Sequence, residues 1–415
     1  MTQPTSRIEE YLAARPAPKA HVHSKLGPAL TPGAPALTGG EGSLLVDDAG
    51  NTYLDLVAGS GTCFLGRNNP RITAACRDLL EMDLPNLSIV NASILGGVVA
   101  GELLGLTNGQ MNKVIYANSG TESTDVMIRF ARVITKRRRF LYLEGGFHGR
   151  SFGAVSLAGF PELREGQAPF MPECTAVPVN DLRALRRELK QGDVAGFIYE
   201  PVQRLTGVEL DRGYLREAEI LCRQAEVLLL ADESHTGLGR TGHWFHSIGL
   251  GIRPDMMSVS STLSGGAVPV AAVMMTDPVY DTVYTGLTSG PIYFSTFAEN
   301  NLAMTASLVT LEQLAELDAP ALAQQVSATL REGLTELQGR GAKISHIGGA
   351  GLMLTVHFDD ELSAEDVQRK LLADHRVIVN LAGPGTNAIS LTPAVTLGAD
   401  EQVRFIQAMG AALGV

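Results

Sequence analysis

The sequence predicts an α/β fold in which a mostly parallel sheet is covered by helices on both faces, and three observations support this prediction. Short apolar or β-branched runs recur between residues 113 and 275. Stretches with an apolar helical face separate several of these runs, as in residues 121–136 and 214–226. The chain has 415 residues and is 45% hydrophobic, which is enough for a large core. Near-continuous apolar strands that alternate with helices are typical of parallel sheets buried on both sides.

The expected elements follow in order along the chain. Residues 1–40 are rich in Pro, Gly and Ala and predict an extended arm. Residues 44–56 alternate apolar and polar side chains around a turn signal at 48–51, which indicates a β-hairpin. The runs expected as strands of the large sheet are 113–118, 139–145, 196–201, 227–233, 256–261 and 268–275.

The pattern changes after residue 305, where a helical stretch (308–338) precedes short strands at 352–358 and 377–381. This order predicts a smaller α+β unit. The expected division is residues 1–60 as an arm and part of the small domain, 61–305 as the large domain, and 306–415 as the small C-terminal domain.

Charge and composition narrow the classes of function. The net charge of −11 argues against a general affinity for nucleic acid or anionic membranes. The one basic run, residues 136–139, is interpreted as the solvated end of a helix. We expect no signal peptide and no membrane span, because the start has early acids and the longest apolar stretch contains polar residues. The four scattered cysteines favour a reducing compartment, so the sequence predicts a cytoplasmic location.

Ligands of open parallel sheets bind at the carboxyl ends of the strands, so the residues after each run are the candidate site. Ser119, Gly120 and Thr121 follow the first run at the start of a helix. Free backbone N–H groups, a hydroxyl and the positive helix end make this turn a candidate phosphate site. An ordinary helix cap is the alternative interpretation.

Other strand ends carry ionisable and aromatic side chains. Phe147 is a candidate to stack on a planar ligand, and His148 is a candidate acid or base. Glu200 follows another strand and is a candidate substrate contact. Asp232 ends an apolar strand, where a carboxylate needs a cationic partner. The histidines from His235 onwards fit no zinc-binding spacing, so no metal is expected.

Together these segments form an ordered set that resembles the class III (ω-type) aminotransferase family of fold-type I pyridoxal-phosphate enzymes. In chain order the motifs are LLVDDAGNTYLDLVAGSG, NSGTEST, GGFHGR, YEPVQ, LLLADESHTGLGRTGHWF, RPDMMSVSSTLSGG and YFSTFAENN. They cover roughly residues 40–305. The resemblance implies a large domain with a mostly parallel seven-stranded sheet, a smaller α+β domain, and a homodimer with active sites at the subunit interface.

The resemblance also implies roles for individual residues. Gly120 and Thr121 would hold the phosphate of pyridoxal or pyridoxamine 5′-phosphate. Phe147 would stack on the pyridine ring. Asp232 would pair with the protonated ring nitrogen, which keeps the ring an electron sink. Thr296 would reach the phosphate from the neighbouring subunit.

The sequence departs from the family pattern at the lysine that forms the Schiff base with the cofactor. An ungapped alignment from Asp232 places Ser261 in the position of that lysine. No lysine occurs between Lys190 and Lys343, so a shifted alignment does not supply one.

Further departures lie elsewhere. His235 stands where the family usually has Gln, Ser390 where it has a carboxylate-binding Arg, and Glu299 where it commonly has Gly. Several changes together favour natural divergence over a single engineered substitution.

These observations leave three functions open. The first is an atypical enzyme that binds pyridoxal or pyridoxamine phosphate noncovalently. It would act on a small molecule by non-transaminating or lysine-independent chemistry, in specialised metabolism, with His235 or His148 moving the proton. The second is a cofactor-free enzyme that uses Ser261 and His235 in the same site. The third is a non-catalytic paralogue that serves as a binding or regulatory subunit.

Overall fold

The computed structural model describes residues 36–87, 93–285 and 291–415, and for Ser261 it describes the backbone alone. Most of the arm predicted over residues 1–40 lies outside these ranges. The described end of that segment, β1 (Leu37–Glu41), is a strand paired antiparallel with β2 (Leu44–Asp47). The hairpin expected over 44–56 is confirmed, because β2 pairs antiparallel with β3 (Thr52–Asp55).

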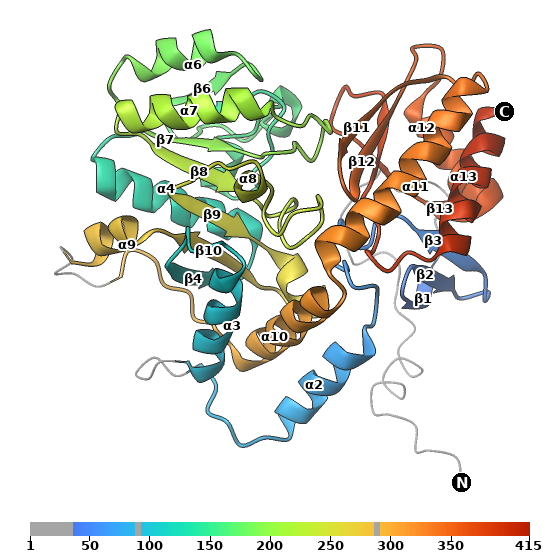
Figure 1. The fold of residues 1–415 in the computed structure, drawn as a ribbon, viewed down its shortest axis with the longest axis horizontal. Coiled ribbons are helices and arrows are strands. Elements are labelled where there is room, and N and C mark those ends of the chain that lie inside the picture. The colour runs from blue at the N-terminus through green and yellow to red at the C-terminus, as the bar shows by residue number, and fades with distance from the viewer. Residues whose placement is uncertain (1–35, 88–92, 286–290) are drawn as a thin grey trace.

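A seven-stranded sheet in the order β4-β10-β9-β8-β7-β5-β6 forms the centre of the larger part of the molecule (Figure 1). Neighbouring strands are parallel except that β10 runs antiparallel to both β4 and β9. The strands are β4 (Lys113–Ala117), β5 (Arg139–Leu143), β6 (Cys174–Val177), β7 (Val194–Tyr199), β8 (Leu228–Asp232), β9 (Met256–Val259) and β10 (Ala271–Met275). The predicted α/β fold with a mostly parallel sheet is confirmed. The edge strand β6 was missed, because its residues are partly exposed and form no apolar run.

The two faces of this sheet are buried in different hydrophobic clusters. In β5, Leu141 and Leu143 belong to one cluster, whereas Phe140 and Tyr142 belong to the other. The first cluster includes side chains of α6 (Leu182–Leu189) and α7 (Arg212–Gln224), and the second includes side chains of α4 (Gly120–Thr135). Successive side chains of a strand point to opposite faces, so burial of both faces produces the near-continuous apolar runs seen in the sequence.

The second part of the molecule contains two smaller sheets. One has the order β1-β2-β3-β13, in which β13 (Val377–Ile378) pairs parallel with β3 across a wide sequence separation. The other has the order β11-β12-β15-β14. Its strands are β11 (Ile344–Ala350), β12 (Met353–Phe358), β15 (Ala388–Leu391) and β14 (Asn380–Leu381). Helices α11 (Ala319–Gly339), α12 (Ala364–His375) and α13 (Ala399–Leu413) lie beside these sheets (Figure 1). The domain boundaries themselves remain a prediction.

The helical stretch predicted over 308–338 is two helices. The first, α10 (Asn301–Glu316), ends before Asp318, whose φ of 47° breaks the helical path, and α11 begins at the next residue. The remaining helices are α2 (Pro70–Leu80), α3 (Ile94–Gly105), α5 (Phe152–Val155), η2 (Pro161–Leu163), α8 (His246–Gly249), η3 (Ser261–Ser264) and α9 (Asp277–Tyr284). Within the described ranges no helix combines the length and apolar character needed to cross a membrane.

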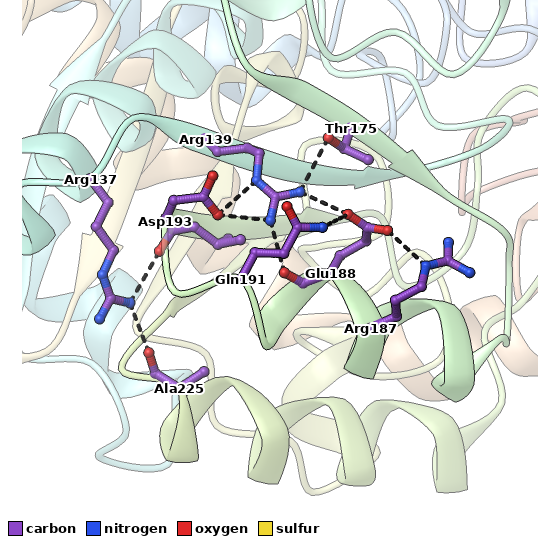
Figure 2. Close-up of polar contacts among 9 residues, drawn as sticks. Arg137, Arg139, Thr175, Arg187, Glu188, Gln191, Asp193 and Ala225 are labelled. Carbon is purple, nitrogen blue, oxygen red and sulfur yellow. Dashed lines mark hydrogen bonds and ion pairs between the residues drawn. The ribbon is translucent and has the colours of Figure 1, made fainter.

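The interpretation of residues 136–139 as the solvated end of a helix is wrong for Arg139. Lys136 is exposed at the end of α4, but Arg139 is buried as the first residue of β5. Its Nη1 lies 2.9 Å from Glu188 Oε2, and its Nη2 lies 2.8 Å from Asp193 Oδ1 (Figure 2). The strand starts only a few residues after the helix, so the last cation of the run faces the protein interior.

Candidate active site

The candidate site lies at the carboxyl edge of the seven-stranded sheet. Asp232 is the last residue of β8, and Glu200 directly follows β7. His148 belongs to the segment after β5, and its ring contacts Asp232. Because these strands are parallel, residues far apart in sequence meet at one edge, as the strand-end argument predicts.

Asp232 makes three polar contacts at this edge. Its Oδ2 lies 2.8 Å from His148 Nδ1. Its Oδ1 accepts hydrogen bonds from Ser258 Oγ at 3.0 Å and from the Ser234 backbone N–H at 3.1 Å. A carboxylate offers about four acceptor positions, so one acceptor position remains for a further donor. Ser258 was missed in the sequence, because it lies inside the otherwise apolar strand β9.

The contact between Asp232 and His148 favours the charged form of each group. Burial opposes ionisation of Asp232, but its hydrogen bond with His148 and the charge of that ring outweigh this effect and lower the pKa of Asp232 to about 2. Burial opposes protonation of His148, yet the same contact with Asp232 raises the pKa of His148. His148 Nε2 is buried and has no hydrogen-bond partner among the described residues. Asp232 therefore has the cationic partner that its burial requires, and that partner is His148.

Glu200 connects two loops at the same edge. Its Oε2 accepts a hydrogen bond from the Phe147 backbone N–H at 2.8 Å, and its Oε1 accepts one from the Arg204 backbone N–H at 3.2 Å. Burial raises the pKa of Glu200 to about 7, although the charge of His148 acts in the opposite direction. Glu200 therefore positions the loops that carry Phe147 and Arg204.

Arg204 is a component of the site that the sequence reasoning did not identify. Its Cζ lies 5.6 Å from the centroid of the Phe147 ring, and Arg150 Cζ lies 5.7 Å from the same centroid. Arg204 directly follows the motif YEPVQ, and this position was the sequence signal that could have indicated it as a site residue. We use the name Asp232 cluster for Phe147, His148, Glu200, Arg204 and Asp232.

The turn at the start of α4 has features of both a helix cap and a candidate phosphate site, the two interpretations of its sequence. Ser119 is the helix cap, since its Oγ accepts the Glu122 backbone N–H at 3.3 Å. The N–H groups of Gly120 and Thr121 have no acceptor among the described residues. The Thr121 hydroxyl accepts the N–H groups of Arg150 and Ser151 at 3.1 and 2.8 Å, so it fixes the neighbouring loop. Two free N–H groups at the positive end of a 16-residue helix remain available to an anion.

Contacts around Gly120 place this turn beside the Asp232 cluster. A Cβ added at Gly120 would lie 3.1 Å from Ser234 Oγ and 3.2 Å from Ser260 Oγ. Ser234 is also bonded to Asp232 through its backbone N–H. Ser261 begins η3 directly after Ser260, so the backbone of the expected lysine position lies next to a residue that touches the turn. The side chain of Ser261 is outside the described structure.

His235 is half-buried near three charged groups. Burial lowers the pKa of His235 well below its usual value, the charges of Arg204 and Arg240 lower it further, and Asp232 opposes the shift. The ring is therefore neutral at pH 7 and is a weaker base than an ordinary histidine.

The structure does not place Thr296 with the other predicted site residues of this chain. Thr296 lines a cavity of about 530 Å³ together with Tyr116, Tyr293 and Glu299, and the cavity lining contains no member of the Asp232 cluster. Thr296 is exposed. Its predicted role, contact with the phosphate of a neighbouring subunit, stays a prediction.

The chemistry of these groups fits a ligand that has a phosphate and a protonated aromatic ring nitrogen. The free N–H groups of Gly120 and Thr121 suit the phosphate. The ionised Asp232, with an acceptor position left, suits a protonated ring nitrogen. Phe147 provides an aromatic face.

Comparisons with known proteins agree with this chemistry. The family described as "Aminotransferase class-III" matches residues 31–413. The chain is 34% identical to acetylornithine aminotransferase of Methanopyrus kandleri over 378 residues, which is 91% of this chain and 94% of that protein. It is 32% identical over 320 residues to aminotransferase PigE of a Serratia species, covering 77% of this chain but 38% of PigE.

A solved structure shows the same fold. Ornithine aminotransferase from Toxoplasma gondii superposes with a TM-score of 0.88 at 24% identity, covering 99% of this chain and 98% of that chain. The chain thus spans most of the acetylornithine and ornithine enzymes, and a little over a third of PigE.

Proposed function

Because the chain belongs to the class III aminotransferase family, we propose that it is a divergent enzyme of that family that works without a covalent lysine. Membership of the family supports pyridoxal 5′-phosphate or pyridoxamine 5′-phosphate as the cofactor. The observation that carries the proposal is the buried, ionised Asp232 at the carboxyl edge, close to a backbone position occupied by Ser261.

The positions of the described lysines support the lysine-free part of the proposal. Lys113 Nζ lies 3.5 Å from Asp277, and Lys343 Nζ lies 3.0 Å from Glu361. Lys370 Nζ donates to the Ala412 carbonyl. The other two described lysines, Lys136 and Lys190, are exposed at the ends of α4 and α6. Among the described residues, no lysine is in contact with the Asp232 cluster.

The residues that would hold the cofactor are those whose chemistry fits it. Gly120 and Thr121 would bind the phosphate, Phe147 would cover the ring, and Asp232 would accept a hydrogen bond from the ring nitrogen. When bound, the cofactor supplies an electron sink for a substrate amine or carbonyl carbon. Binding would be noncovalent, since these contacts need no bond to the chain.

The two histidines would have different roles. His148 is fixed to Asp232 through Nδ1, and this contact raises the pKa of His148, so the ring would keep that carboxylate in place. His235 is neutral and less buried, so it would be the group that takes a proton from the substrate. His235 is therefore the proposed catalytic base, and Ser261, whose backbone follows Ser260 at the start of η3, is proposed as a second polar group of the site.

The remaining parts of the proposal concern assembly and setting. A homodimer would bring Thr296 of one subunit to the phosphate site of the other. Residues 61–305 would form the large domain, and the flanking segments 1–60 and 306–415 would contribute to the small domain. The substrate is a small molecule, and we propose a cytoplasmic location.

Restoring a lysine tests the proposal. We expect native protein to bind pyridoxal phosphate saturably, with no cofactor retained on the chain after borohydride reduction and denaturation. S261K should gain a reducible covalent bond to the cofactor, detected by mass spectrometry of the intact chain. A267K is the matched control, because Ala267 is exposed in the same segment and should gain no such bond.

Each contrary outcome contradicts a defined part of the proposal. Covalent retention by native protein would show that another lysine serves. Absence of saturable cofactor binding would favour the cofactor-free enzyme or the non-catalytic subunit. If S261K and A267K react equally, position 261 is not the lysine position.

A further inference from the structure

Arg204 places an unneutralised positive charge over the aromatic face of the Asp232 cluster. Its guanidinium lies 5.6 Å from the Phe147 ring centroid and is half-buried. Among the described residues it forms no hydrogen bond and no ion pair, and its contact with Glu200 is made by the backbone N–H. A buried or half-buried guanidinium usually has an anionic partner, because its donors lose their bonds to water.

The nearby carboxylates do not supply that partner. Glu200 accepts the backbone N–H groups of Phe147 and Arg204, and among the described residues no hydrogen bond or ion pair joins it to the Arg204 guanidinium. Asp232 is engaged with His148, Ser258 and Ser234. A further cation, Arg240, is fully buried and, within the described parts of the chain, donates to the backbone carbonyls of Gly61 and Pro393 alone. The site therefore has an excess of positive charge before any ligand binds.

The backbone that carries Arg204 is held in place from both sides. Gln203 and Val208 are joined by a backbone hydrogen bond of 2.8 Å, which closes a tight loop around Arg204. Two carbonyls of this loop accept hydrogen bonds of 2.7 Å from outside it. The Leu205 carbonyl accepts the Gly383 N–H, and the Gly207 carbonyl accepts the Gly349 N–H. These bonds tie the loop to the smaller sheet. A guanidinium on a fixed loop is preorganised to bind a ligand with less loss of entropy.

We propose that Arg204 is a specificity-determining residue that binds an acid group, a carboxylate or a phosphate, on the substrate. The inference rests on the proposed function, because it assigns the substrate class of the same site. The N–H groups of Gly120 and Thr121, which have no acceptor among the described residues, are the proposed site of the cofactor phosphate, so Arg204 would be available to a second anion. Position 390, where a carboxylate-binding Arg was expected, is a serine of β15 in this chain. Arg204 supplies a cation in its place.

Pairs of probes that differ only in the acid group test this inference. The pairs are 4-aminobutanoate with butylamine, and O-phosphoethanolamine with ethanolamine. Calorimetry of the full-length protein, with and without pyridoxal phosphate, should show at least one acid probe binding about tenfold or more tightly than its neutral partner. In R204M this ratio should fall to near one, and R204K should retain part of it.

The matched control is R164M. Arg164 lies 4.4 Å from the Phe170 ring centroid and donates to Tyr142 Oη, so it has the same kind of stacking contact outside the Asp232 cluster. R164M should keep the acid preference of native protein. A circular dichroism spectrum and melting curve of R204M establish that the variant is folded, and R204K provides the milder change.

Several outcomes would overturn the inference. They are equal affinity of native protein for both members of each pair, unchanged preference in R204M, and no binding of either acid probe. If R204M instead weakens pyridoxal phosphate and leaves the probe ratio unchanged, Arg204 binds the cofactor phosphate and the substrate assignment is wrong. If native protein fails to bind pyridoxal phosphate, the proposed function is contradicted. In that case the ratio of affinities for the acid and neutral probes, measured without cofactor, still decides the role of Arg204.

Discussion

Two groups of buried charges lie at opposite edges of the seven-stranded sheet and are organised in opposite ways. At the amino edge, Arg139 donates to Glu188 and Asp193 and has its charge neutralised (Figure 2). At the carboxyl edge, Arg204 has no acceptor among the described residues. Burial lowers the pKa of Arg204. Burial also acts against Arg139, but the contacts with Asp193 and Glu188 outweigh it and raise the pKa of Arg139.

The difference separates a structural role from a functional one. The Arg139 cluster (Arg139, Glu188 and Asp193) joins β5, α6 and the start of β7, and its charges are satisfied within the chain. The Asp232 cluster holds an ionised carboxylate and a guanidinium with free bonding capacity, which lowers stability unless a ligand uses it. Groups with perturbed ionisation in such a setting are typical of binding and catalytic sites.

Breaking the Arg139 cluster should have the largest effect on stability. R139M leaves Glu188 buried without its main partner, so the free energy of unfolding should fall by about 3 kcal/mol. Urea denaturation measures this loss. In R187M, which removes an exposed partner of Glu188, the loss should stay below about 1 kcal/mol. Equal losses in the two variants would contradict a structural role for Arg139.

The pH dependence of stability should reveal Glu200. Burial raises the pKa of Glu200 from 4.5 to about 7, so folded protein holds this proton after the unfolded chain has released it. The stabilisation is complete below pH 4.5 and is lost as pH rises to about 7, by up to about 3 kcal/mol. Denaturation at several pH values should show this slope in native protein and in E226Q, an exposed control. Its persistence in E200Q would assign the slope to another group.

The smallest expected effect concerns the affinity for the cofactor. D232N removes a charged hydrogen-bond acceptor, so pyridoxal phosphate should bind about 10- to 100-fold more weakly. Absorbance titration measures the change. D255N is the control, because Asp255 accepts the Leu229 N–H at the opposite edge of the sheet and should leave cofactor affinity unchanged. Equal affinity of D232N and native protein would remove Asp232 from the cofactor site.

The strand-end rule was effective for side chains that belong to the strands or directly follow them. Asp232 and Glu200 were expected at one edge because parallel strands present their carboxyl ends there, and both lie at that edge, while their roles in a site stay predictions. The partner of Asp232 was not identified, since the His148 ring is brought to it by the loop after β5. Arg204 was missed because its exposure and partners depend on how a loop closes, which the sequence pattern does not report.

The sequence by itself determined six of the seven strands of the sheet, its two buried faces and the edge at which polar groups gather, because these follow from local periodicity and strand direction. Only the tertiary structure decided which charges are neutralised. Ion pairing depends on distances of a few ångströms between segments far apart in the chain, so Arg139 became an internal support and Arg204 an open binding group.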